Sequence, residues 1–154
     1  MAVMDVGNIL QVSPPKEIYH NPKSKFVSEF IGNINTFETK ILSSNKDELS
    51  IYIEGIGNVK INNKYEISDS DIIYSAIRPE EISISKISKS SNNKNYEGII
   101  KNISFYGEST YFYVQLNNSE KVIMVSNYEE KDFFKEKDKC YINFDLNNLK
   151  IIKD

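Results

Sequence analysis

The hydrophobic periodicity of the chain changes near residue 34, and this change constrains the fold more than any other feature. Between Phe26 and Ile31 the apolar residues recur at helical spacing. From Phe37 onward they alternate with polar residues in short runs separated by turns, which is typical of half-buried β-strands. Many short strands joined by turns favour a sandwich or a small barrel. We therefore predict a mainly β fold.

The alternating region repeats its own pattern. Thr36–Ile41 aligns with Asn95–Ile100, and each segment is followed by a hairpin and then by a closing strand. Between the two halves, Ser88–Asn95 has the polar, low-complexity composition of a linker. We therefore predict two small five-stranded OB-like units packed side by side, at about 34–87 and 95–154. A charged segment of the second half, at 127–137, is predicted to be a solvated helix.

The first 33 residues are predicted to form a β-hairpin and two short helices, distinct from the β region at 34–154. Two apolar runs flank Asp5–Asn8, which is a turn signal. Pro15 suits the first turn of a helix, and Pro22 interrupts that helix. Gly32 is a suitable stop for the second helix, whose four apolar residues are expected to form one stripe.

The composition argues against several classes of function. With a net charge of −3 and no clustered basic face, the chain is not expected to bind nucleic acid. The single histidine, His20, and the single cysteine, Cys140, offer neither a metal-binding spacing nor a catalytic triad. Cys140 lies on an alternating apolar pattern and is expected to be a small buried hydrophobe. Without a signal peptide or an apolar run of transmembrane length, we expect a cytoplasmic chain.

Two segments resemble a known family. Gly7–Tyr19, continuing through Asn21–Pro22 to Phe26–Asn35, is similar to the stretch that closes the ATPase domain of importer ABC subunits. Ala76–Ile82 reads A-I-R-P-E-E-I and resembles the R-P-E signature of the TOBE regulatory domain that follows it. The ending F-I-G-N-I-N resembles the spermidine/putrescine importers more than the maltose type. The chain departs from the family at Ser13, where glycine is usual, and has asparagine where glutamate is common in that ending.

The resemblance implies the regulatory and dimerisation domain of the ATP-binding subunit of a polyamine importer. The parent subunit would be an ATPase that binds ATP and Mg²⁺, pairs with a second copy and contacts transmembrane permease subunits at the inner face of the cell membrane. The sequence contains no G-x-x-x-x-G-K-[ST] loop for phosphate. We therefore expect no catalysis and no cofactor in this chain, and we expect Met1 to mark the start of a fragment whose ATP site lies upstream.

Six residues are candidates for a regulatory or interface role: Arg78, Glu80, Tyr106, Glu108, Tyr111 and Tyr113. Arg78 pairs with an acidic neighbour or a partner subunit in one interpretation, and fixes the exit of a strand in the favoured one. The tyrosines are either a subunit contact or the outer face of a strand whose other face fills the core. Carboxylates beside aromatic rings also suit an imported polyamine. The set for such a site is Glu97, Tyr106, Glu108, Tyr111, Tyr113 and Asp145, although ordinary surface residues are the favoured interpretation.

A second hypothesis is a free-standing OB-type protein that binds a small ligand or an oligonucleotide. Stacking of bases on the tyrosines would serve such a protein. The first 33 residues distinguish the two hypotheses, because they have no evident use in a free-standing binder and resemble the end of an ATPase domain.

Overall fold

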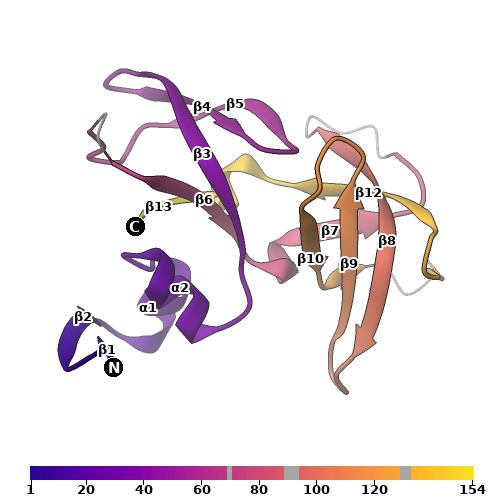
Figure 1. Cartoon of the computed structure of the whole chain (residues 1–154), viewed down its shortest axis with the longest axis horizontal. Helices are drawn as coiled ribbons and strands as arrows, with labels where there is room; N and C mark the ends of the chain where they lie inside the picture. Colours follow the sequence, from indigo (N-terminus) through magenta and orange to yellow (C-terminus); the bar gives the residue numbers. More distant parts are fainter. Residues whose placement is uncertain (69–70, 89–93, 129–132) are drawn as a thin grey trace.

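The computed structural model describes residues 1–68, 71–88, 94–128 and 133–154 (Figure 1). The N-terminal part is a hairpin followed by two helices, as predicted. Val6 and Gly7 both have positive φ at the hairpin turn, as a tight two-residue turn requires. These elements are β1 Ala2–Asp5, β2 Asn8–Val12, α1 Pro15–His20 and α2 Lys25–Ile31. No helix of the described residues is long and apolar enough to cross a membrane.

The first sheet has five strands in the order β13-β6-β3-β4-β5. The predicted alternation is confirmed, because Phe37, Leu49 and Ile51 are buried while Glu38 and Lys40 face outward. β6 lies inside the sheet, between β13 and β3, which accounts for its run of buried residues. The strands are β3 Asn35–Ser44, β4 Glu48–Ile53, β5 Gly57–Asn62, β6 Ile73–Ile77 and β13 Lys150–Lys153.

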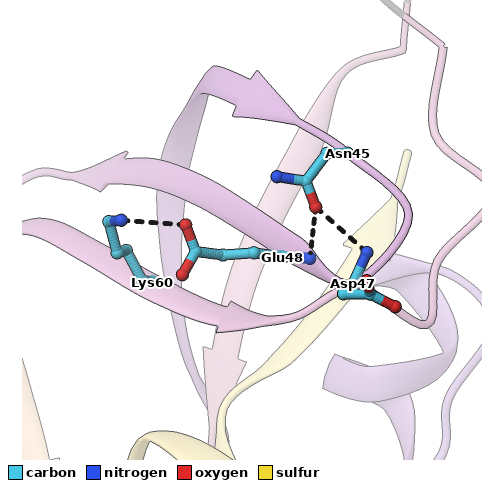
Figure 2. Close-up of polar contacts among 4 residues, drawn as sticks. All are labelled: Asn45, Asp47, Glu48 and Lys60. Atoms are coloured by element: carbon cyan, nitrogen blue, oxygen red, sulfur yellow. Dashed lines mark hydrogen bonds and ion pairs between the residues drawn. The ribbon is translucent and has the colours of Figure 1, made fainter.

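A local polar network forms the turn between β3 and β4 of this sheet (Figure 2). The side-chain oxygen of Asn45 accepts hydrogen bonds from the backbone N–H groups of Asp47, at 3.0 Å, and Glu48, at 2.8 Å. Glu48 then forms an ion pair of 2.9 Å with Lys60 on the neighbouring strand. Asn45 thus forms the turn that sets where β4 begins.

The second sheet has the order β10-β9-β8-β12-β7-β11, in which β11 has only two residues. Phe112, Val114 and Leu116 fill its core, as predicted, and so does Cys140. Burial raises the pKa of the Cys140 thiol to about 12. The strands are β7 Ile82–Ser85, β8 Asn95–Phe105, β9 Thr110–Leu116, β10 Val122–Val125, β11 Asn127–Tyr128 and β12 Lys139–Phe144. Two 3₁₀ turns, η1 Pro79–Glu81 and η2 Leu146–Asn148, follow β6 and β12.

The two halves of the chain exchange their last strands. β7 follows β6 along the chain but pairs with β12 in the second sheet. β13 follows β12 but returns to pair with β6 in the first sheet, as the yellow C-terminal end in Figure 1 shows. The halves at 34–87 and 95–154 therefore do not coincide with the two sheets, and each sheet is completed by the other half.

The sheets are also joined by side chains. The amide of Asn35 donates to the carbonyl of Met124 at 2.8 Å and accepts from its N–H at 2.7 Å, which satisfies the edge of β10. Gly55, with φ +79°, lies so close to Ser119 that a β-carbon on Gly55 would be 2.8 Å from that side chain. The buried residues of both sheets form one continuous cluster.

Two details of the sequence prediction are wrong. Instead of a helix at 127–137, Asn127–Tyr128 pair in parallel with β7, and Lys137 has a positive φ in a turn; residues 129–132 lie outside the described residues, as do 89–93 of the predicted linker. The apolar stripe of the second helix is split. Val27 packs against Val3 and Ile18, whereas Phe26 and Phe30 stack on each other and are 41% and 65% exposed.

Phe144 should be essential to the second unit. Its ring is buried and stacks on Tyr96 with the centroids 5.6 Å apart. Truncation of a buried phenylalanine costs ~3–5 kcal/mol. We expect Phe144→Ala to lower the free energy of unfolding in urea by this amount, with the exposed Phe133→Ala as the matched control. An unchanged unfolding midpoint for Phe144→Ala would contradict the packing described here.

Candidate functional site

Arg78 connects the N-terminal helices to the β region. It lies between the end of β6 and η1, and it is only 3% exposed although it carries a charge. Its side chain extends back toward the helices. A buried cation is stable only where polar groups surround it, so its partners identify what this position does.

The guanidinium group donates to the C-terminal ends of both helices. Nη1 lies 3.2 Å from the carbonyl oxygen of Ser28 and 3.0 Å from those of Gly32 and Asn33, at the end of α2. Nη2 lies 3.1 Å from the carbonyl oxygen of Tyr19, in the last turn of α1. The last carbonyl groups of a helix lack partners within it, and the helix dipole favours a cation at that end. One side chain therefore caps two helices.

The remaining contacts of Arg78 fix its orientation. Its guanidinium carbon lies 4.1 Å from the centre of the Tyr19 ring. Its backbone N–H donates to the Glu81 carboxylate at 3.0 Å, which closes η1. Burial lowers the pKa of Arg78 from its usual value, although Tyr19, Glu80 and Glu81 oppose this effect. Within the part of the chain that the structure describes, Nε is a buried polar atom without a hydrogen-bond partner.

Glu80 acts through Tyr19. The Tyr19 hydroxyl donates to Oε1 of Glu80 at 2.5 Å. Partial burial raises the pKa of Tyr19 to about 12, and the hydrogen bond to Glu80 and its negative charge add to this. Arg78 and Glu80 thus both bind Tyr19 of α1. Pro79 between them accepts a hydrogen bond from the N–H of Ser126 at the end of β10.

The predicted tyrosines lie together on the β8–β9 hairpin. Tyr106 and Tyr111 contact edge to face, with ring centroids 5.7 Å apart. Burial, together with a hydrogen bond to Tyr106, raises the pKa of Tyr113. Glu108 is exposed in the turn between the two strands. The three tyrosines thus lie together at the end of the hairpin whose turn contains Glu108.

Glu97 and Asp145, which were also predicted to bind a cation, do not lie near these tyrosines. Glu97 lies eight residues before the end of β8, at Phe105, a distance of ~26 Å along an extended strand. Asp145 accepts a hydrogen bond from the N–H of Asn147 and caps η2. β12 pairs with the opposite end of β8 from the tyrosines. The proposed grouping of Glu97 and Asp145 with Tyr106 is therefore wrong.

A groove that sequence reasoning missed lies on the outer face of the first sheet. It measures about 580 Å³, and we call it the outer-face groove. Tyr74 on β6 pairs with Glu38 on β3, and Lys40 on β3 pairs with Tyr52 on β4. The alternation of each strand placed these side chains outside the core, but only the strand pairing brings them together. Its lining residues include Glu38, Lys40, Tyr52, Glu54, Asp71 and Tyr74.

Loss of Arg78 should loosen both helices. Arg78→Met would leave the capped carbonyl groups buried without partners, at a cost of about 2–4 kcal/mol. We expect a lower unfolding midpoint and faster proteolysis between His20 and Asn35. Arg78→Lys keeps the charge but lacks the planar guanidinium group that reaches both helices. It should therefore lower the unfolding midpoint by a smaller amount. Lys101→Met, on an exposed position, is the control; an equal response of all three variants would exclude a specific role for Arg78.

The contact between Tyr19 and Glu80 should make stability depend on alkaline pH. A group whose pKa is raised by folding stabilises the folded state fully below its unfolded pKa, about 10 for tyrosine. That contribution is lost as the pH rises from about 10 toward the folded value, about 12. We expect the difference in unfolding free energy between the parent and Tyr19→Phe to fall over this interval, with Tyr52→Phe as the matched control. A difference that does not change with pH would contradict this.

Comparison with known proteins places the chain in a family. Residues 75–149 match the TOBE domain. A spermidine/putrescine import ATP-binding protein of Fusobacterium nucleatum is 34% identical over 149 residues, which are 94% of this chain and 40% of that protein. Its counterpart in Nitrosospira multiformis is 34% identical over 121 residues, 77% of this chain and 33% of that protein. The chain thus spans between a third and two fifths of the length of these relatives.

One solved structure is similar to this chain in fold, but not in sequence. The cytoplasmic molybdate-binding protein ModG superposes with a TM-score of 0.54 at 11% identity, over 77% of this chain and 94% of that protein. It shares the OB-like, mainly β architecture described above. With the sequence relationships, this gives one conclusion: the chain contains a TOBE domain and belongs with the C-terminal parts of the spermidine/putrescine import ATP-binding proteins.

Proposed function

We propose that this chain is the regulatory end of the ATP-binding subunit of an ABC importer for polyamines. The observation that carries the proposal is the attachment made by Arg78, a residue of the TOBE match, to both helices of the N-terminal part. The Fusobacterium nucleatum relative aligns across both parts, since its match covers 94% of the chain. In this proposal the helices end the ATPase domain, and Arg78 joins the regulatory domain to it.

The N-terminal part presents the kind of surface that such an arrangement needs. Large apolar side chains on the hairpin and on the outer side of α2 are exposed, whereas α1 and the inner side of α2 are tied to Arg78. Exposed apolar patches of this kind mark interaction sites, and the occupant here is the remainder of the ATPase domain. The residues concerned are Met1, Met4, Val6, Ile9, Val12, Phe26 and Phe30.

In the complete importer, the ATPase domain binds ATP and Mg²⁺ and the TOBE domain is non-catalytic. Two copies of the subunit associate beneath the permease subunits, on the cytoplasmic face of the membrane. The TOBE domains keep the pair together and modulate ATPase activity. A coupling free energy of ~1–3 kcal/mol between the domains changes transport several-fold, and contacts as specific as those of Arg78 are able to transmit it.

One observation favours a free-standing small-ligand binder as the second candidate. ModG, which this chain covers over 94% of its length, is a molybdate-binding protein whose structure holds bound molybdate. The capped helices argue against it, because a free-standing binder does not need Arg78 directed at an N-terminal segment.

A chimera tests the proposal. The corresponding C-terminal part of the Fusobacterium nucleatum relative is replaced by this chain, and the chimera is expressed in cells that lack their own polyamine importer ATPase. We expect spermidine uptake to be restored, and Arg78→Met to reduce uptake several-fold at equal expression. Lys101→Met serves as the matched control. A folded chimera that hydrolyses ATP but restores no uptake would contradict the importer assignment.

A further inference from the structure

The C-terminal strand β13 and the N-terminal part enclose a groove, which we call the junction groove. β13 is an edge strand of the first sheet, and Figure 1 shows it beside the N-terminal helices. Ser24, just before α2, forms a parallel bridge with Lys153 of β13. The groove measures about 400 Å³ and is lined by residues 21–23, 64–67 and 150–153. This volume lies within the range of small-molecule sites.

The edge of β13 is already covered, so the groove suits a compact ligand and not an added strand. Ser24 covers one end of this edge through its bridge to Lys153. A hydrogen bond from the backbone of Ile151 reaches Tyr65, although burial raises the pKa of the Tyr65 hydroxyl overall. Tyr65 thus contacts the strand, and Nζ of Lys64 lies 5.8 Å from the centre of its ring.

Lysines outnumber carboxylates in the junction groove. Lys23, Lys64 and Lys150 line it, and none of the three forms an ion pair with a carboxylate of the described residues. Lys153 is different, because it forms an ion pair of 2.8 Å with Asp71. Glu66 is the single carboxylate among the lining residues. The groove is therefore a positive site on a chain of net charge −3, and it attracts an anion.

Protection of an edge strand does not account for all of these lysines. Lysine on an edge strand prevents pairing with other chains, and this explains Lys150 on β13. Lys23 lies in the link between α1 and α2, and Lys64 lies in the connection that follows β5. Both come from segments outside the sheet, yet they line the same groove as Lys150.

The junction groove also has an apolar lining. Pro22, Ile151 and Ile152 are buried, and Ile67 is half-buried and packs against the core. An anion without an organic part would leave this lining unused. Lysines from three segments bind as separate point charges, which suits an anion with several oxygens and more than one charge. A phosphate group has three terminal oxygens and a charge of about −1.5 to −2.

We propose that the junction groove binds a small organic phosphate, in which a phosphate group is joined to a compact apolar body. The ammonium groups of Lys23, Lys64 and Lys150 bind the phosphate oxygens. The apolar body lies against Pro22 and Ile67. This inference goes beyond the importer assignment and does not depend on it, because every lining residue belongs to this chain.

A ligand in this groove acts on the same joint as Arg78. It contacts the N-terminal part through Lys23 and the β region through Lys64 and Lys150. Pro22 and Lys150 also line a small cavity beside Arg78. A ligand that binds both parts at once has full affinity only while they are joined, so its binding stabilises the joined state. The bound phosphate therefore strengthens the attachment that the guanidinium group makes.

Phenyl phosphate is the probe, titrated into the full chain by calorimetry at physiological salt. We expect saturable binding, with inorganic phosphate and phenol each binding more weakly because each lacks one half of the ligand. Lys64→Met and Lys150→Met should each weaken binding about two- to fivefold, and Glu66→Gln should strengthen it by a similar factor. Lys101→Met and Glu97→Gln make the same charge changes on exposed positions of β8 and should leave the affinity unchanged.

A second measurement tests whether the ligand bridges the two parts. Saturating phenyl phosphate should raise the unfolding midpoint and slow proteolysis between His20 and Asn35. Compared at equal occupancy, Lys23→Met should lose most of this protection, because the β region alone then holds the ligand. Lys64→Met should retain the protection at the same occupancy. Circular dichroism confirms that each variant folds.

The proposal is overturned if phenyl phosphate shows no saturable binding, or if inorganic phosphate binds as tightly. It is also overturned if Glu66→Gln weakens binding, or if Lys101→Met weakens it as much as Lys64→Met does, which is the behaviour of a diffuse charge. Binding that gives no protection against proteolysis would exclude the bridge. Uptake by the chimera tests the importer role separately, so working transport without binding of phenyl phosphate would overturn this inference alone.

Discussion

The capping of two helices by one guanidinium group is the interaction on which the N-terminal part depends. α1 and α2 have six and seven residues, too few for a helix to be stable in water without tertiary contacts. Their C-terminal carbonyl groups converge on Arg78, the only arginine in the chain. A lysine could not form the same set of bonds, because only a planar fork directs several N–H groups at separate acceptors. The other 18 of the 19 basic residues are lysines, so this position is chemically distinct.

The exchange of strands between the sheets makes the β region respond as one body. β7 and β13 each complete the sheet of the other half, and Asn35 bonds both backbone groups of Met124 across the boundary. One unit therefore does not unfold or rotate without disturbing its neighbour. Arg78 lies on the connection between β6 and β7, where the chain passes from one sheet to the other. Any shift between the sheets consequently acts directly on the residue that holds the helices.

The sequence predicted the elements well because their signals are local. Alternation identified the strands from Phe37 to Phe144, and turn chemistry at Val6 and Gly7 identified the hairpin. Strand exchange was not predictable, because alternation says which face of a strand is buried and nothing about its neighbours. The R-P-E motif singled out Arg78, but its acceptors are backbone oxygens 45 to 59 residues away, and a backbone carbonyl has no sequence signature.

The geometry of a strand also explains why Glu97 does not lie beside the tyrosines of the β8–β9 hairpin. Glu97, Glu108 and the nearby tyrosines are close in sequence, but a strand extends ~3.3 Å per residue and separates them along β8. A sheet gathers side chains across its strands instead. Glu38 and Tyr74 are 36 residues apart and directly paired, and Lys25 reaches the same ring from a helix. The helix α2 is thus held at both ends by residues far away in the sequence, because Lys25 at its start lies over the Tyr74 ring and the guanidinium group of Arg78 binds carbonyl groups at its end.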